Sequence, residues 1–301
     1  DIALYRAKEQ GRNTYQFYME GMQDREVMRL ELDKDLSQAL ANDEFVLYYQ
    51  PQLDLDTNEV TSVEALIRWQ HPRRGLLAPC EFIPLAEESG RITEIGRWVV
   101  LAACRQLARW KGTPCENLRI AVNLSGRELD DESLVAHIRD TLLAEQVNPA
   151  MLEVELTEEI FIQNIEHNLN QLRQLHQLGV HLAIDDFGVG YSSLSYLMNF
   201  PVDLRDFPVD ILKIDRSFIT EVTSRHDDAV ITRAVINLAH NLGIRVVAEG
   251  VETRDQLNFL RRHHCNLAQG FLINHPVPPE ELESSIMVEA PFAREPAISR
   301  L

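Results

Sequence analysis

The stretch LEVELTEEIFIQNIEHNLNQLRQLHQLGVHLAID, residues 152–185, holds the pattern that decides the fold. Its two ends, residues 152–156 and 181–185, are short runs rich in Val, Ile and Leu, which is typical of buried parallel strands. Residues 165–178 between them follow a helical pattern, and Gly179 comes just after them, where a C-terminal helix cap belongs. The stretch therefore predicts a strand, a helix and a second strand.

The same alternation of short apolar runs and helical patterns extends along the chain in both directions. The other predicted strands are residues 45–50, 60–67, 119–124, 211–214, 245–248 and 268–273, and the other predicted helices are residues 94–110, 134–145, 229–242 and 254–262. Eight strands interleaved with helices over about 250 residues have the size and rhythm of a (β/α)8 barrel. We therefore predict an α/β fold, a TIM-like (β/α)8 barrel of parallel strands. The alternative is a doubly wound open sheet, but the glycine-rich phosphate turn that normally follows its first strand is absent.

Two segments flank the predicted barrel, which we assign to residues 44–290. Residues 19–43 form a linker in which residues 22–41 are predicted to be an amphipathic helix. Residues 291–301 carry two prolines and few large apolar groups, so we expect a frayed tail. The apolar positions of the linker helix include Val27, Leu30, Leu32, Leu36 and Leu40.

The composition of the 301 residues limits the partners that the chain can have. Hydrophobic residues make up 45% and charged residues 25%, as in a globular protein with a substantial core. The net charge of −18 opposes binding of a long nucleic acid, but a small phosphodiester is compatible because divalent cations can invert the local field. The four scattered cysteines form no CxxC pair, and we expect free thiols in a reducing cytoplasm. No apolar run reaches the ~20 residues of a membrane span, but the missing initial Met suggests a fragment, whose parent could carry a membrane anchor.

Polar side chains stand at the ends of the predicted strands, where barrel enzymes build their active sites. A single carboxylate at such a place is more commonly a helix cap or a solvated loop residue. Six or more acids at one end of one barrel, however, would repel one another strongly unless cations neutralised them. The residues are Glu64, Asn123, Glu155, Glu158, Asp185, Asp186, Lys213, Asp215, Glu249, Glu252 and Gln269.

These oxygen donors include no Cys or His, which favours Mg²⁺ or Mn²⁺ over zinc. The adjacent Asp185 and Asp186 suit a site of two ions, in which one carboxylate bridges the pair and a bound water attacks a phosphoryl centre. Lys213 can orient that water or assist its deprotonation. The residues thus predict metal-dependent hydrolysis of a phosphodiester.

Several strings resemble, in family order, the motifs of EAL-domain cyclic di-GMP phosphodiesterases. They span about residues 44–288, and the resemblance implies a TIM-like barrel that hydrolyses cyclic di-GMP to linear pGpG with two Mg²⁺ or Mn²⁺ ions. The strings are EALIRW (64–69), AVNLS (121–125), ELTE (155–158), DDFGVGYSSLSYL (185–197), LKIDRSFI (212–219), AEGVE (248–252) and QGFLINHP (269–276).

The resemblance implies metal ligands residue by residue. Asp185 would bridge the two ions, and the second ion would also use Asp186, with Glu249 helping directly or through water. The implied ligands of the first ion are Glu64, Asn123, Glu155 and Asp185.

Other residues of the motifs take implied roles in catalysis and substrate binding. Lys213 is similar to the residue that activates or holds the hydrolytic water, and Gln269 to the residue that orients the catalytic centre. Glu158 resembles the glutamate that steadies the lid loop after the Asp pair. The implied catalytic set is Glu64, Lys213, Glu249 and Gln269, and the implied substrate contacts are Arg68 to a phosphate and, more weakly, Gln50, Asp215 and Pro276.

Residues 1–18, DIALYRAKEQGRNTYQFY, resemble the C-terminal end of a GGDEF diguanylate cyclase domain. Because the signature loop of such a domain is absent, we expect no cyclase activity from this chain. This resemblance implies a parent protein with covalently attached GGDEF and sensor domains. The resemblance to EAL domains implies that the barrel forms a homodimer.

Three positions depart from the family pattern. Val189 stands where the lid loop usually has Thr, which removes a hydrogen bond worth about 1 kcal/mol. Asn274 and His275 replace a pair that more often contains serine, which leaves the guanine contacts there open. The string FPVD occurs at residues 200–203 and again at 207–210, where the family has it once. We expect a surface bulge there, with an altered dimer contact as the alternative.

Two other classes of function compete with the hydrolase. A receptor would bind cyclic di-GMP without cleaving it, and a scaffold would only dimerise or regulate an attached domain. Receptors of this family usually lack a metal ligand or the catalytic glutamate. Because every implied metal ligand and catalytic residue has the expected residue type, the sequence favours the active hydrolase.

Overall fold

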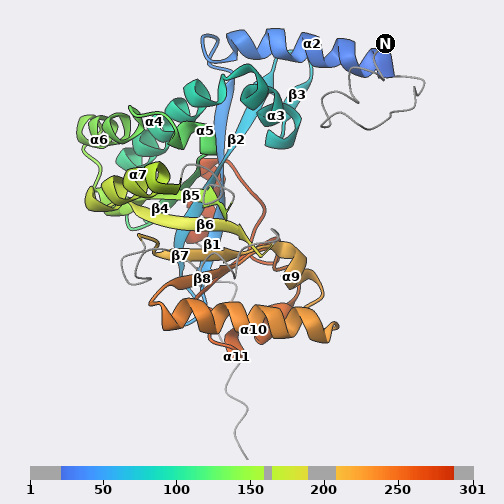
Figure 1. Cartoon of the computed structure of the whole chain (residues 1–301), viewed down its shortest axis with the longest axis vertical. Helices are drawn as coiled ribbons and strands as arrows, with labels where there is room; N and C mark the ends of the chain where they lie inside the picture. The colour runs from blue at the N-terminus through green and yellow to red at the C-terminus, as the bar shows by residue number, and fades with distance from the viewer. Residues whose placement is uncertain (1–21, 159–164, 189–207, 288–301) are drawn as a thin grey trace, which may run out of the picture. The chain divides into compact units, whose positions relative to one another are not determined.

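The structure, a computed structural model, describes residues 22–158, 165–188 and 208–287 (Figure 1). Val189 and the first FPVD copy lie outside these ranges. The chain divides into two compact units, one of residues up to 45 together with 69–91, the other of residues 46–68 together with 92 onward.

The larger unit is built on a closed barrel of eight strands, which confirms the predicted fold class. Their order around the barrel is β1-β9-β8-β7-β6-β5-β4-β2, and a further pairing of β1 with β2 closes the ring. The strands are β1 (Phe45–Asp54), β2 (Val60–His71), β4 (Arg119–Asn123), β5 (Leu152–Thr157), β6 (His181–Phe187), β7 (Ile211–Ile214), β8 (Arg245–Ala248) and β9 (Leu267–Gln269).

Two details of the predicted barrel are wrong. β1 runs antiparallel to β9, whereas all strands were predicted to be parallel. Only residues 55–59 separate β1 from β2, and so short a connection cannot hold the crossover that parallel neighbours need. In addition, β9 ends at Gln269 instead of residue 273, because the chain folds into a turn in which Ile273 N donates to Gly270 O.

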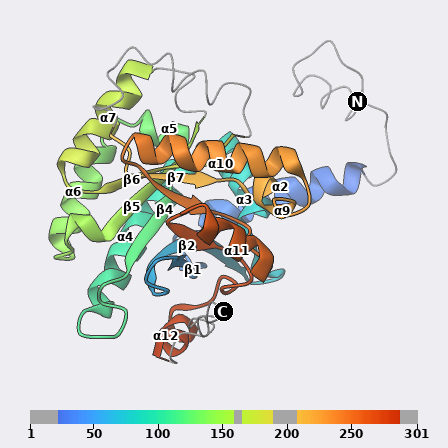
Figure 2. The ribbon, with the colours of Figure 1, turned by 90° about the horizontal axis from the view of Figure 1, so that it is seen from below.

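Helices connect the strands and cover the outside of the barrel. Five were predicted and are confirmed within three residues at each end: α4 (Ile92–Trp110), α6 (Leu134–Ala144), α7 (Ile165–Gln177), α10 (His226–Asn241) and α11 (Arg254–Arg262). Figure 2 shows α4, α6 and α7 side by side, and α10 packs against β7 and β8. The elements that were not predicted are short: α5 (Gly126–Leu129), η1 (Pro149–Met151), α9 (Arg216–Thr220) and α12 (Pro279–Met287). Helices of one or two turns show too little periodicity to be recognised.

The barrel interior has an apolar half and a polar half one layer below the candidate site. Side chains that point into a barrel recur at every second strand position. On β6 to β9, the residues two positions before Asp185, Lys213, Glu249 and Gln269 form the buried apolar cluster Ala183, Ile211, Val247 and Leu267. On β1, β2, β4 and β5, the corresponding buried residues are Gln52, Ser62, Ala121 and Glu153, which are polar apart from Ala121.

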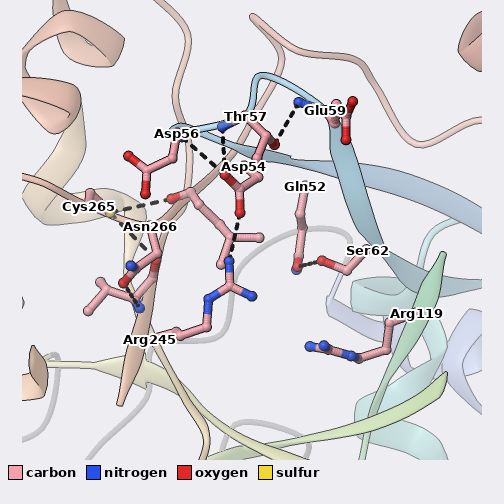
Figure 3. A network of polar contacts seen from close by, with 12 residues as sticks. Gln52, Asp54, Asp56, Thr57, Glu59, Ser62, Arg119, Arg245, Cys265 and Asn266 are labelled. Carbon is pink, nitrogen blue, oxygen red and sulfur yellow. Dashed lines mark hydrogen bonds and ion pairs between the residues drawn. The ribbon is translucent and has the colours of Figure 1, made fainter. Parts of the chain in front are cut away.

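The amino-terminal end of the barrel carries charges in pairs. Figure 3 shows Asp54, at the end of β1, bonded to Arg245 at the start of β8, with 2.8 Å between Asp54 Oδ2 and Arg245 Nη2. The other oxygen of Asp54 accepts the N–H groups of Asp56 and Thr57. On β4 and β5, Arg119 Nη1 lies 3.0 Å from Glu153 Oε2.

The smaller unit contains α2 (Met22–Ala39), α3 (Pro79–Ser89) and β3 (Gly75–Leu77), which pairs antiparallel with the end of β2. The helix predicted over residues 22–41 is present and ends two residues earlier than expected. Leu32 and Leu36 of this helix are buried, whereas Leu30, predicted on the same apolar face, is 65% exposed. α3 was not predicted, because Pro84 interrupts its helical pattern.

Candidate active site at the carboxyl end of the barrel

Seven of the predicted site residues come together at the carboxyl end of the barrel because parallel strands end at the same side. In the register of β4 and β5, Asn123 stands opposite Glu155, and in that of β5 and β6, Thr157 stands opposite Asp185. The residues that meet there are Glu64, Asn123, Glu155, Asp185, Lys213, Glu249 and Gln269, as their contacts below establish.

Asp185 and Asp186 both reach the site although neighbouring strand residues normally face opposite sides. The register between β6 and β7 shifts between Ile184 and Phe187, and Asp186 has a positive φ of 53°. Asp tolerates this left-handed conformation better than most residues, and a bulge of this kind redirects side chains. As a result, Asp185, Asp186 and Glu249 each bring a carboxylate oxygen within 4.8 Å of the others.

The Lys213 ammonium lies at the centre of the cluster and is fully buried. Its Nζ is 2.7 Å from Glu155 Oε2, 2.7 Å from Glu249 Oε1 and 3.2 Å from Asp185 Oδ1. A fourth carboxylate oxygen, Glu64 Oε2, is 3.6 Å away. Four carboxylates thus converge on a single positive charge.

This imbalance shifts the pKa values of the cluster. Burial alone would lower the pKa of Lys213, but Glu155, Glu249, Glu64 and Asp185 raise it well above its ordinary value. Burial raises the pKa of Glu155 well above its ordinary value although Lys213 opposes the shift, and it raises the pKa of Glu249 to about 8. The pKa of Asp186 is raised by burial and by Asp185.

Glu64 differs from the other carboxylates because two amides hold its ionised form. Asn123 Nδ2 donates to Glu64 Oε1 at 2.7 Å, and Gln269 Nε2 donates to Oε2 at 2.5 Å. Burial would raise the pKa of Glu64, but Lys213 and these two donors together lower it below its ordinary value. Gln269 is held in turn because Gly270 passes the backbone of Val251 so closely that a Cβ would lie 2.2 Å from Val251 O.

The donor set fits divalent cations that prefer oxygen. In the part of the chain that the structure describes, Glu155 Oε1 is buried without a hydrogen-bond partner, which is costly for an isolated acceptor. Asp185, Asp186 and Glu249 bring their carboxylate oxygens close enough together to hold a cation. Hard carboxylate and amide oxygens of this kind are ligands for Mg²⁺ or Mn²⁺.

The other predicted site residues are placed as follows. Glu158 Oε2 accepts from Gly188 N at 3.5 Å, next to the Asp pair, and Gln50 Oε1 accepts from Gln269 Nε2 at 3.1 Å. Arg68 lies over the ring of Tyr48, with 5.5 Å to the ring centroid. Asp215 caps α9 by accepting from Ser217 N, and Pro276 precedes Val277, which pairs with Tyr49.

Sequence reasoning missed Gln52, which stands opposite Gln269 in the register of β1 and β9 and donates to its side chain. The predicted first strand stopped at residue 50, so Gln52 fell outside it, whereas β1 continues to Asp54. The signal was present: Gln50 and Gln52 alternate along an otherwise apolar stretch, as residues that face one side of a strand do.

A protein-family model, the EAL domain, matches residues 33–276 of the chain. Among curated proteins, the bifunctional diguanylate cyclase/cyclic di-GMP phosphodiesterase MucR of Pseudomonas aeruginosa is 43% identical over 286 residues, which cover 95% of this chain and 41% of that protein. The cyclic di-GMP phosphodiesterase NbdA of the same organism is 44% identical over 282 residues, which cover 94% and 35%. The chain therefore spans less than half the length of these relatives.

Among solved structures, the phosphodiesterase PaMucR in complex with c-di-GMP has a TM-score of 0.77 and 43% identity. The match covers 84% of this chain and 99% of that one. The likeness therefore extends from sequence to the arrangement of the whole barrel.

Proposed function

The chain belongs to the EAL domain family, and from this premise we propose that it hydrolyses cyclic di-GMP to linear pGpG with bound divalent cations. The observation that carries the proposal is the convergence of Glu64, Glu155, Asp185 and Glu249 on the buried Lys213. Such an excess of carboxylates is suited to cations and a phosphodiester, and is costly without them.

The proposed cations are two Mg²⁺ or Mn²⁺ ions. When bound, they would lower the pKa of a water and stabilise the attacking and leaving oxygens of the phosphoryl group. Asp185 would be shared, with Asp186 and Glu249 on one side. The ligands on the other side would be Glu64, Asn123 and Glu155.

The protein's own side chains would hold the water and the substrate. Lys213 lies within hydrogen-bond reach of three carboxylates and would keep the hydrolytic water oriented by donating a hydrogen bond to it. Arg68 would bind a phosphate of the substrate by charge. Glu158, next to Gly188, would steady the loop that follows the Asp pair. Weaker contacts to the substrate are proposed for Gln50, Asp215 and Pro276.

The proposed setting is a larger signalling protein. Residues 1–18 would be the end of a GGDEF domain, 19–43 a linker, 44–290 the phosphodiesterase and 291–301 a tail, with sensor domains elsewhere in the parent. We also propose that the barrel pairs as a homodimer. All four cysteines are free and three are buried, which fits a reducing cytoplasm. Among the described residues, none of the helices has the length and apolar character needed to cross a membrane.

Chromatography of cyclic di-GMP after incubation with the protein tests the proposal. We expect pGpG to form with Mg²⁺ or Mn²⁺ and not with a chelator, and we expect Glu64→Gln to abolish it. Glu281→Gln, the same change at an exposed position of α12, is the matched control. Tight binding of cyclic di-GMP with no product under either cation would instead identify a receptor.

A further inference from the structure

A chain of buried hydrogen bonds runs from the polar half of the barrel interior to Glu64. Ser62 Oγ donates to Gln52 Oε1 at 2.6 Å, as Figure 3 shows, and Gln52 Nε2 donates to Gln269 Oε1 at 2.9 Å. Gln269 Nε2 then donates to Glu64 Oε2 at 2.5 Å. None of these four residues is more than 6% exposed.

The direction of these bonds determines the orientation of the Gln269 amide. An amide has one end that donates and one that accepts, and the two ends can exchange places by rotation. The ionised Glu64 carboxylate can only accept, so the amino group of Gln269 faces it and the Gln269 oxygen faces Gln52. The amino group of Gln52 donates to that oxygen, and the Gln52 oxygen accepts from the Ser62 hydroxyl.

The opposite orientation of Gln269 would be unfavourable at both of its ends. Its amino group would face the amino group of Gln52, and its oxygen would face the Glu64 carboxylate. A buried donor or acceptor left without a partner loses its solvation without replacement. This series of hydrogen bonds therefore keeps the amino group of Gln269 on Glu64 Oε2 and limits the positions that the Glu64 carboxylate can take.

We propose that Gln52 and Ser62 are positioning residues for Glu64, and through it for the cation that Glu64 would bind. The inference rests on the proposed metal-dependent function. Neither residue belongs to the cluster around Lys213, and both act through Gln269. Residues that orient a metal ligand in this way typically change metal affinity by about 10- to 100-fold when they are replaced.

Substitutions of matched shape separate the hydrogen bonds from packing. Gln52→Met keeps the length of the side chain and removes both of its hydrogen bonds. Ser62→Thr and Ser62→Val have the same shape as each other, and only Thr retains the hydroxyl that donates to Gln52. Thr61→Val is the control, because Thr61 faces the outside of the barrel, where it lines a cavity of about 530 Å³.

The dissociation constant for Mn²⁺ is measured on the full chain without substrate, from the paramagnetic resonance signal of the free ion. We expect Gln52→Met to raise it about 10-fold and Ser62→Val about threefold. We expect Ser62→Thr and Thr61→Val to stay within twofold of the unchanged protein. At saturating Mn²⁺, kcat for cyclic di-GMP should fall while KM changes less than twofold, because neither Gln52 nor Ser62 is among the proposed substrate contacts.

Three results would overturn the inference. The first is a Mn²⁺ dissociation constant within twofold of the unchanged protein for Gln52→Met. The second is an equal effect of Ser62→Thr and Ser62→Val, which would show that shape matters and the hydroxyl does not. The third is an unchanged chain that binds no Mn²⁺, which would overturn the proposed metal-dependent function as well. Normal Mn²⁺ binding without pGpG formation would overturn only the proposed hydrolysis and leave the positioning role supported.

Discussion

The two ends of the barrel contain the same kinds of charged residues in different proportions. At the amino-terminal end, Asp54 pairs with Arg245 and Glu153 with Arg119, one acid to one base. At the carboxyl end, four carboxylates converge on the single ammonium of Lys213. Acids and bases paired one to one balance each other within the fold. An excess of carboxylates instead favours binding of cations, because like charges repel one another.

The comparison also separates two kinds of buried glutamate on the same strand. Glu153 and Glu155 are both fully buried on β5, and burial raises the pKa of each. Arg119 partly offsets the shift at Glu153, whereas the neighbours of Glu155 include Glu64 and Asp185 as well as Lys213. Glu153 is paired with the guanidinium of Arg119 alone, whereas Glu155 shares the ammonium of Lys213 with other carboxylates.

Lys213→Met should have the largest effect, because it removes the shared positive charge from the carboxyl end. Loss of the group that holds the hydrolytic water should lower kcat by about 1,000-fold, a typical contribution of acid–base catalysis. Mn²⁺ should raise the melting temperature of the variant more than that of the unchanged protein, since the carboxylates then have no internal cation. Activity and melting curves with and without Mn²⁺ measure both effects.

The matched control for this substitution is Lys111→Met, at an exposed lysine whose Nζ donates to Gln146 O. It should leave kcat unchanged. Equal stabilisation of Lys213→Met and the unchanged protein by Mn²⁺ would contradict the view that Lys213 substitutes for a cation.

The second prediction concerns the pH dependence of the metal-free protein. The pKa of Glu249 rises from 4.5 in its ordinary state to about 8 in the fold. A carboxyl whose pKa is raised on folding stabilises the protein while protonated, and this contribution is lost as pH rises from about 4.5 to about 8. Lys213, whose pKa is raised above 10.5, and Glu64, whose pKa is lowered below 4.5, act outside this window.

We therefore expect the free energy of unfolding in chelator to fall by a few kcal/mol between pH 5 and 8. Glu249→Gln should make this fall in stability smaller, with the rest due to Glu155 and Asp186, whose pKa values are also raised. Mn²⁺ should make stability rise with pH instead, because the ionised carboxylates then have a counter-ion. Chemical denaturation at several pH values provides the measurement. A metal-free protein whose stability rises across this range would show that the cluster carries no excess charge.

The sequence was sufficient for most of the barrel because each long element carries its own periodic pattern. All eight strands and five long helices of the barrel unit were predicted from apolar periodicity, and the barrel from their alternation. The direction of β1 was not recognised, since it depends on a short loop rather than on the strand itself. The helices α5 and α9 are too short to show a period.

The candidate site was likewise predicted only in part from the sequence. Strand ends and motifs predicted which carboxylates would be close, because parallel strands bring their ends together. They did not predict that Lys213 would contact Glu155, Asp185 and Glu249 simultaneously, since side-chain rotamers decide those distances. Nor did they reveal Gln52, whose role follows from the direction of its hydrogen bonds.

The third prediction breaks a pair at the amino-terminal end. Arg119→Met leaves Glu153 buried without its cation, which should lower the free energy of unfolding by about 3 kcal/mol. The double variant Arg119→Met with Glu153→Leu should recover most of the loss, because no buried charge remains. Denaturant titration of both variants measures the difference. A double variant as unstable as the single one would mean that packing, and not charge, explains the loss.

Arg245→Met should have the smallest effect, and it sharpens the contrast between the two ends. The Arg245 side chain is 41% exposed, so solvent screens its bond to Asp54 and the pair should contribute about 1 kcal/mol or less. Asp54 also keeps the N–H groups of Asp56 and Thr57 after the substitution, which stabilises its charge. Melting temperature and kcat measured together distinguish the roles of the two ends. A small fall in melting temperature with unchanged kcat is expected, whereas a large loss of activity in a folded Arg245→Met protein would mean that this end also takes part in the reaction.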